Sequence, residues 1–538
     1  KLDVLVWNQK DFFFFFNLQT YRLKQSALLA SLCLTACMVG PDYKEPKTDV
    51  AKHWAKKDNS VKETAFKQDK WWDVFHDPNL TQLIYQGYQS NLTLQMTGVR
   101  ILQARAQLAK SVGTLYPQTQ TMNGNYLAYR MGGSYLQDVL PESFDATLLG
   151  FSANWESDFW GKFRRSVRSN DATFLSSVAA YDNALVTMTS DIASHYIGVR
   201  GSESLIRITE QNITLQKHSL ALTTARYTAG AVSLRDVEEA KTQLAETEAI
   251  LPGLVSELQI QKDALAVLLG TTPNRVDGLL KKQYGIPRAP ASVEVGIPRD
   301  MLLRRPDINQ ARFDAITQSE AIGATKANLF PSFSLGGSFY FAGNTIYGST
   351  ISEMFNWSNR NSVAGPGLNW PILNYGQITN MVRTQDAVFQ EKLLNYMNAI
   401  LVAQKEVQDS MTAYIETKKA VKSYAEAVRA AKKATSLTLI QYREGETGYT
   451  SVLYAQQQQL YTQMEWVKAE ADVPKALVSL YRALGGGWQI RSDHDVIPEN
   501  IKQAMASRTN WGNLLLQKNH EVPKTKTEQF KTLYFPNW

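Results

Sequence analysis

Cysteine is almost absent from this chain. Its 538 residues contain only two cysteines, Cys33 and Cys37, and both lie close to the N-terminus. We expect Cys33 to be removed with a signal peptide and Cys37 to carry lipid. The mature chain would then have no disulfide, although it enters an oxidising compartment. Its stability must come from packing and assembly.

Long apolar runs and the common enzyme motifs are also missing. Mean hydropathy is −0.29, and no apolar run reaches the roughly 18 residues of a transmembrane helix. The six histidines are scattered, and the sequence has no HExxH, no CxxC, no phosphate-binding Gly-Lys-Ser/Thr loop and no nucleophile elbow. The net charge of +7 is spread without a basic block. We therefore predict that the protein is not an enzyme, uses no cofactor or metal, and does not bind nucleic acid.

Proline is absent from two runs of equal length. Residues 161–230 and 376–445 begin and end at glycine and are rich in Ala, Gln, Leu, Glu and Lys, which are good helix formers. As helices they would each be about 100 Å long, and the return legs that follow would reach only about 60 Å. Gly230 and Gly445 would form the turns, because glycine tolerates the left-handed C-cap geometry. The spacing predicts two helical hairpins with a long first leg and a short second leg.

The two runs belong to an internal duplication. Residues 225–270 align with residues 440–485 at an offset of 215 without a gap. The shared positions include Tyr227 with Tyr442, Gly230 with Gly445, Val237 with Val452, Ala240 with Ala455, Leu265 with Leu480 and Gly270 with Gly485. A period this long indicates a duplicated half-protein and not a solenoid.

The N-terminal region has the features of a secretory signal. Two basic residues, Arg22 and Lys24, precede a short apolar run, residues 26–36, which is too short to cross a bilayer. The first methionine of the sequence is Met38. We interpret residues 1–22 as an over-extended start, within a signal region that ends at residue 36.

Alternating residues predict strands before each proline-free run. From Thr119 to Tyr126, threonines and asparagines occupy every second position. In the second half, Phe333, Leu335, Phe339 and Phe341 alternate with serines and a tyrosine. With their partners they make four strands of about 10–14 residues in two hairpins, long enough to cross a membrane when tilted. Four strands cannot close a membrane barrel, so each subunit of an oligomer would contribute four. An antiparallel sheet in a soluble domain is the alternative.

Local signals divide the remaining chain. Asp77 is a suitable N-cap residue, and Pro78 is suited to the first turn of a helix. We expect this helix to continue through Asn91 to Leu108. Asp307 with Gln310 resembles a capping box. The expected plan is a linker at 37–70, a first repeat at 71–270, a proline-rich, non-helical connector at 271–306, a second repeat at 307–488 and a polar tail at 489–538.

Taken together, these motifs resemble TolC-like outer-membrane efflux proteins of the lipid-anchored, NodT-type branch, over about residues 23–488. Leu34-Thr-Ala-Cys37 resembles a bacterial lipobox, which implies cleavage before Cys37 and acylation of its sulfur; an ordinary signal with a chance cysteine is the alternative. The other carriers are Pro41-Asp-Tyr-Lys-Glu-Pro46, Trp71-Trp72 to Leu80, Leu302-Leu-Arg-Arg-Pro-Asp-Ile308, Asn328-Leu-Phe-Pro331, Trp155 to Gly161, Trp370 to Gly376, and Gly485-Gly-Gly-Trp488.

The resemblance implies a fold and a function. The expected fold is an α+β membrane homotrimer, with a twelve-stranded outer-membrane barrel continued by a long periplasmic helical barrel and an equatorial collar. The expected function is passive exit of small molecules, delivered by an inner-membrane resistance-nodulation-division transporter through a periplasmic adaptor. Two alternatives are the export duct of a type I protein secretion system and a coiled-coil lipoprotein that tethers envelope layers.

In this family the hairpin tips form the gate and the adaptor-docking surface. The matching positions here are Arg226, Tyr227, Gly230, Tyr442, Arg443, Glu444, Gly445 and Glu446. Relatives often place an aspartate two residues after the second glycine, where this chain has Thr447. Two interpretations of Glu444 and Glu446 stay open: a replacement for that acidic ring, or solvated turn residues.

Overall fold

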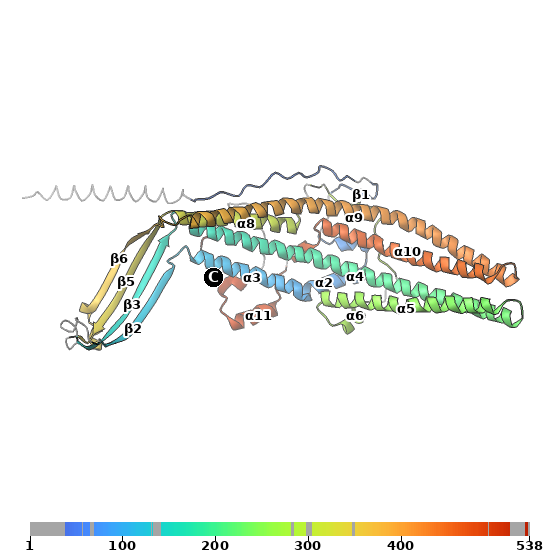
Figure 1. The fold of residues 1–538 in the computed structure, drawn as a ribbon, viewed down its shortest axis with the longest axis horizontal. Coiled ribbons are helices and arrows are strands. Elements are labelled where there is room, and N and C mark those ends of the chain that lie inside the picture. The colour runs from blue at the N-terminus through green and yellow to red at the C-terminus, as the bar shows by residue number, and fades with distance from the viewer. Residues whose placement is uncertain are drawn as a thin grey trace, which may run out of the picture.

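The computed structural model shows an elongated protomer with a sheet at one end and the turns of two helical hairpins at the other (Figure 1). It describes residues 38–55, 58–64, 69–130, 132, 141–280, 285–296, 298, 304–346, 350–492, 494–516 and 533–535. The signal region and Cys37 lie outside the described residues. No helix in these ranges is long and apolar enough to cross a membrane.

Two helical hairpins form the body of the protomer. The long legs are α4 (Lys162–Thr228), with 67 residues, and α9 (Gln377–Glu444), with 68. The short legs are α5 (Leu234–Leu268) and α10 (Tyr449–Ala483), with 35 residues each. The predicted lengths are confirmed, and both turns lie at the same end of the molecule (Figure 1).

Three further helices complete the wall. They are α2 (Pro78–Ser90), α3 (Leu92–Gly113) and α8 (Pro306–Lys326). Helix α4 packs against α3, α5, α8 and α10, whereas α9 packs mainly against α8 and α10. Consequently α4 is enclosed by its own protomer, and α9 stands at an edge (Figure 1).

The sheet projects beyond the helices and has four antiparallel strands in the order β2-β3-β5-β6 (Figure 1). Their bounds are Thr119–Arg130, Ser143–Ser157, Ser332–Asn344 and Arg360–Asn369, as the alternation predicts. Residues that face one another across the strands share chemical character, as in Phe151 with Phe339, Trp155 with Leu335 and Ser152 with Ser338. One face of the sheet is therefore apolar and the other polar.

A collar of short elements surrounds the middle of the helices. It contains β1 (Val61–Lys62) paired in parallel with β4 (Val293–Glu294), the helices α6 (Pro273–Leu279) and α11 (Glu499–Arg508), and three 3-10 turns, η1 (Trp71–Phe75), η7 (Trp488–Arg491) and η8 (Gly512–Leu515). The main apolar core lies here: Trp71 packs on Tyr481, and Val496 and Ile497 are buried in the same cluster.

Four local predictions are wrong. The connector is not free of helix, because α6 lies in it. The segment after residue 488 is not merely a polar tail, because it adds α11 and apolar residues to the core. The helix that starts at Pro78 stops at Ser90; Asn91 is extended, and its side chain accepts a hydrogen bond from the Leu94 amide to cap α3.

The fourth correction concerns the start of α8. The helix begins at Pro306 with Arg305 at the N-cap, and no side chain caps it. Asp307 forms an ion pair with Arg305 and does not form a capping box. The Asp77 prediction is confirmed: its carboxylate accepts hydrogen bonds from the amides of Asn79 and Leu80.

Candidate channel tip, membrane-proximal junction and collar cavity

The backbone of both tips turns at glycine. Gly230 has φ +72° and Gly445 has φ +84°, in the left-handed region that glycine adopts without strain. The amide of Ala231 donates to the carbonyl of Arg226, and the amide of Glu446 donates to the carbonyl of Gln441. These are the closing bonds of a helix C-terminus, and they fix where each long leg ends.

Side chains join the two tips of one protomer. The Arg226 guanidinium lies over the ring of Tyr442, 4.7 Å from its centroid. The Tyr442 ring is buried, meets Tyr449 edge-on with 5.5 Å between centroids, and its hydroxyl lies 3.3 Å from Thr223 Oγ1. The pKa of Tyr449 is raised to about 12, mainly by burial and to a lesser extent by the neighbouring Tyr442. The Tyr449 hydroxyl is therefore neutral at physiological pH.

The other predicted tip residues face solvent in the single protomer. Tyr227 is 42% exposed although it is the duplicate of the buried Tyr442. Arg443, Glu444 and Glu446 are exposed, and their side chains make no hydrogen bond or ion pair with the rest of the described protomer. The structure therefore brings Arg226 and Tyr442 together and leaves these three charges available to a neighbour.

The residue after Cys37 is fixed at the junction of helices and sheet. The Val39 amide donates to the Trp160 carbonyl at 3.1 Å. Met38 lies so close to Gly161 that a Cβ on the glycine would stand 2.6 Å from Met38 Cγ. Buried Arg165 pairs with Glu320 at 2.8 Å and with Asp42 at 3.0 Å, which holds the following turn of the linker on α4 and α8.

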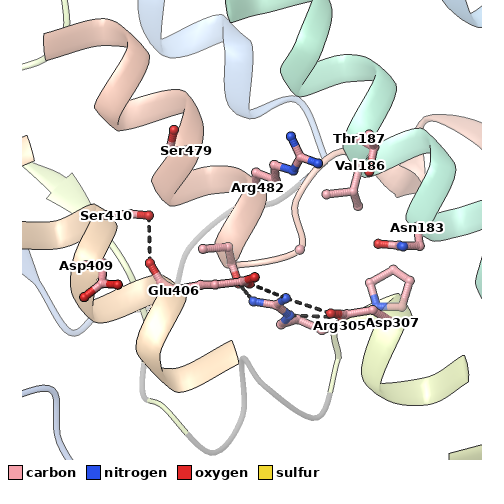
Figure 2. Close-up of a pocket in the computed structure, with 13 residues that line it drawn as sticks. Asn183, Val186, Thr187, Arg305, Asp307, Glu406, Asp409, Ser410, Ser479 and Arg482 are labelled. Carbon is pink, nitrogen blue, oxygen red and sulfur yellow. Dashed lines mark hydrogen bonds and ion pairs between the residues drawn. The ribbon is translucent and has the colours of Figure 1, made fainter. Parts of the chain in front are cut away.

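Figure 2 shows a polar cavity at the edge of the collar, with a volume of about 460 Å³. Its centre is Arg305, which is buried and points at the end of α10. The guanidinium donates to the Ala483 carbonyl at 2.5 Å and pairs with Asp307 and Glu406, each at 2.7 Å. The Arg305 side chain thus links the start of α8 and the end of α10 to α9.

The sequence did not reveal this role of Arg305. Two arginines precede Pro306, and only the fold distinguishes the exposed Arg304 from the buried Arg305. Every nitrogen of the Arg305 guanidinium has an acceptor, which fits a structural joint. Within the described residues, no group of three or more His, Cys, Asp or Glu side chains is placed to hold a metal ion.

Comparison with known proteins agrees with this geometry. The family model described as outer membrane efflux protein matches residues 83–271 and 297–486, once in each half. Nodulation protein T of Rhizobium leguminosarum bv. trifolii is 27% identical over 462 residues, which cover 85% of this chain and 96% of that protein. The solvent efflux pump outer membrane protein SrpC of Pseudomonas putida is 26% identical over 482 residues, covering 87% and 99%.

The solved structure of the outer-membrane channel OprN has a TM-score of 0.77 and 28% identity, and the match covers 84% of this chain and all of that one. The fold and its two hairpins define a TolC-like channel protein, with the duplication visible in the two matched segments. The chain belongs to the outer membrane efflux protein family. It is an outer-membrane channel of a tripartite efflux system, in a family whose members form trimers and work with other pump components.

Proposed function

We propose that this channel conducts small molecules passively, from an inner-membrane resistance-nodulation-division transporter and a periplasmic adaptor to the exterior. The support is the nature of the relatives, which are named for solvent, toluene and antibiotic efflux and for cation efflux. Type I protein export is the second candidate, which the names of these relatives do not mention. The duct performs no chemistry of its own.

Deletion of the gene tests the proposal directly. We expect lower resistance to one or more small toxic compounds, and an unchanged set of secreted proteins in the culture medium. Restoring the wild-type chain should restore both resistance and co-purification of an adaptor. Loss of an exported protein with unchanged resistance would instead favour type I secretion.

We also propose that Cys37 carries the lipid anchor. The support is positional: Met38 and Val39 are held at the junction of helices and sheet, where acyl chains on the preceding residue would reach the membrane. Mass spectrometry of the mature N-terminus should show an acylated cysteine. An unmodified thiol, or cleavage elsewhere, would overturn this assignment. Cys37→Ala should reduce anchoring more than folding.

The gate proposal concerns contacts between the tips of neighbouring protomers. Arg443, Glu444 and Glu446 are exposed and unpaired in the described protomer, so charge-assisted bonds to the next copy are open to them. Each such bond contributes about 1–3 kcal/mol, and threefold symmetry repeats it three times. These bonds would hold the resting channel closed.

Planar-bilayer recording tests this gate. Arg443→Ala combined with Tyr442→Phe should raise single-channel conductance, and Glu446→Gln should weaken block by divalent cations. Arg429→Ala is the matched control, because Arg429 is an exposed arginine of the same helix and forms an i,i+3 ion pair with Glu426 within its own helix. Unchanged conductance in an assembled trimer would refute the gate and leave the channel assignment intact.

A further inference from the structure

The C-terminal segment contacts the outer face of the first hairpin at two levels. Arg491 pairs with the buried Asp182, its Nη2 lying 3.0 Å from Oδ2. Much later in the chain, the Tyr534 hydroxyl accepts a hydrogen bond from Arg168 Nε at 2.9 Å. Asp182 and Arg168 are 14 residues apart on α4, which is nearly four turns, so they share one face about 21 Å apart. Tyr534 therefore lies nearer to the sheet along α4 than Arg491 does.

The described end of this segment lies beside the first strand. The Tyr116 hydroxyl donates to the Tyr534 carbonyl at 3.3 Å. Tyr116 precedes β2 by three residues, and the carbonyl of its neighbour Leu115 accepts from Trp155 Nε1 at 3.2 Å. These hydrogen bonds to backbone carbonyls place Trp155, Tyr116 and Tyr534 near one another at the helix-proximal end of the sheet, and we call these three residues the aromatic band.

Phe535 follows Tyr534 directly, and its side chain is 67% exposed. Arg168 lies six residues from the start of α4, about 9 Å along the helix axis, which is close to the thickness of a headgroup layer of about 5–8 Å. Aromatic side chains gather at this depth in outer-membrane channels because one part of the ring system is apolar and another polar.

A lipid surface is a better occupant than a second copy. Arg168 belongs to α4, which is flanked by α3 and α8 of the same protomer and is not an edge helix. The band also continues the apolar face of the sheet at Trp155, which lies opposite Leu335. We propose that residues 533–535 form a membrane-contacting foot, in which Tyr534 fixes the backbone and Phe535 inserts at the headgroup boundary of the inner leaflet.

A depth-sensitive label tests the foot in the full trimer. Phe535→Cys is introduced into a Cys37→Ala background with a cleavable signal, labelled with the fluorophore NBD and reconstituted in nanodiscs. Emission should be blue-shifted, and quenching by lipids that carry a doxyl group near the headgroup should be several-fold stronger than quenching by aqueous iodide. The matched control is Leu516→Cys, because Leu516 is 71% exposed on the same C-terminal segment but precedes the foot; its label should be quenched by iodide.

Two outcomes would overturn the proposal. Equal iodide quenching at both labelled positions would show that Phe535 is in water. A blue shift without doxyl quenching would show that a neighbouring protomer covers it. Arg168→Met in the labelled chain provides a second measurement: loss of the donor to Tyr534 should reduce doxyl quenching at position 535, and an unchanged value would show that the segment is not held there.

Discussion

The two long helices α4 and α9 are duplicates with opposite environments. They differ by one residue in length, and both follow a glycine with positive φ and end at a glycine turn. Yet 32 of the 67 residues of α4 are buried, against ten of the 68 in α9. Duplication preserved the length of the helix and its turn, and left its surface free to diverge.

The difference follows from position in the wall. Helix α4 has neighbours on both sides within its protomer and is also covered by the collar, whereas the described helices that pack on α9 are mainly α8 and α10. Apolar residues of α9 such as Leu394, Leu401 and Leu437 are about half exposed or more. We expect the next copy in a trimer to cover them, so that α9 gains from assembly the burial that α4 obtains within its own chain.

The largest expected contrast comes from a glutamate placed at equivalent positions. Ala179 of α4 is buried in an apolar cluster with Leu175 and Phe313, and Leu394 of α9, 215 residues later, is 55% exposed. Ala179→Glu buries an unpaired charge and should cost several kcal/mol, enough to prevent folding. Leu394→Glu should leave a folded monomer and abolish the trimer. Mass measurement in detergent checks this, and a trimeric Leu394→Glu would refute the edge assignment.

The next contrast concerns the buried ion pair that holds the C-terminal segment. The second half has Met397 where the first has Asp182; Met397 is partly exposed, whereas Asp182 is buried. Arg491→Met should destabilise the protomer by about 3–5 kcal/mol, because Asp182 is left buried and unpaired. Adding Asp182→Met should recover most of that loss in denaturant unfolding. Failure of the double variant to recover would mean that the pair supplies more than mutual neutralisation.

A smaller contrast separates the two tip tyrosines. Tyr442→Leu removes a ring that stacks under Arg226 and a hydroxyl near Thr223, and should destabilise the tip by about 2 kcal/mol. Tyr227→Leu changes an exposed side chain and should stay within about 0.5 kcal/mol. Hydrogen exchange of the amides at the ends of α4 and α9 measures both. Equal effects would show that the tips pack alike in the assembled protein.

The smallest effects should be the same in both halves. Gly230→Ala and Gly445→Ala each force alanine into the left-handed region and should cost about 1–2 kcal/mol. Neither added Cβ meets an atom closer than 3.5 Å, so backbone strain accounts for most of the expected loss of stability. Gly448→Ala is the control, since Gly448 has φ −80° and open space around it. Limited proteolysis at the tips measures this difference. We expect faster cleavage for Gly230→Ala and Gly445→Ala than for Gly448→Ala.

The long-range plan was predictable because it depends on periodicity and counting. Two proline-free runs between glycines give helix lengths, and alternation gives four strands. Proline and helix propensity did not reveal the break at Asn91, because a capping asparagine inside an apolar pattern looks like any polar surface residue. Val496, Ile497 and Met505 are too sparse to show a period, so their burial depends on α2, α3 and α4, far away in sequence.

At the tips, the pattern placed Tyr227 and Tyr442 near the two glycine turns, but it did not show how their side chains pack. The duplicated tyrosines Tyr227 and Tyr442 are identical in type, and only the packing of one hairpin on the other makes the second buried. The pairing of Arg305 with Glu406 and the end of α10 likewise joins three segments that no local pattern connects. Such joints depend on tertiary geometry, which a single sequence does not encode in any window.

The ion pair between Asp182 and Arg491 joins residues 309 positions apart, and this separation sets an order of events during biosynthesis. The chain emerges N-terminal end first, so α4 is complete long before its arginine partner exists. Until then the first half holds a carboxylate that has no counter-charge and a core that lacks Val496 and Ile497. A chain that terminates early cannot finish this core. The core of the first half is therefore completed only after residues 491–505 have been made.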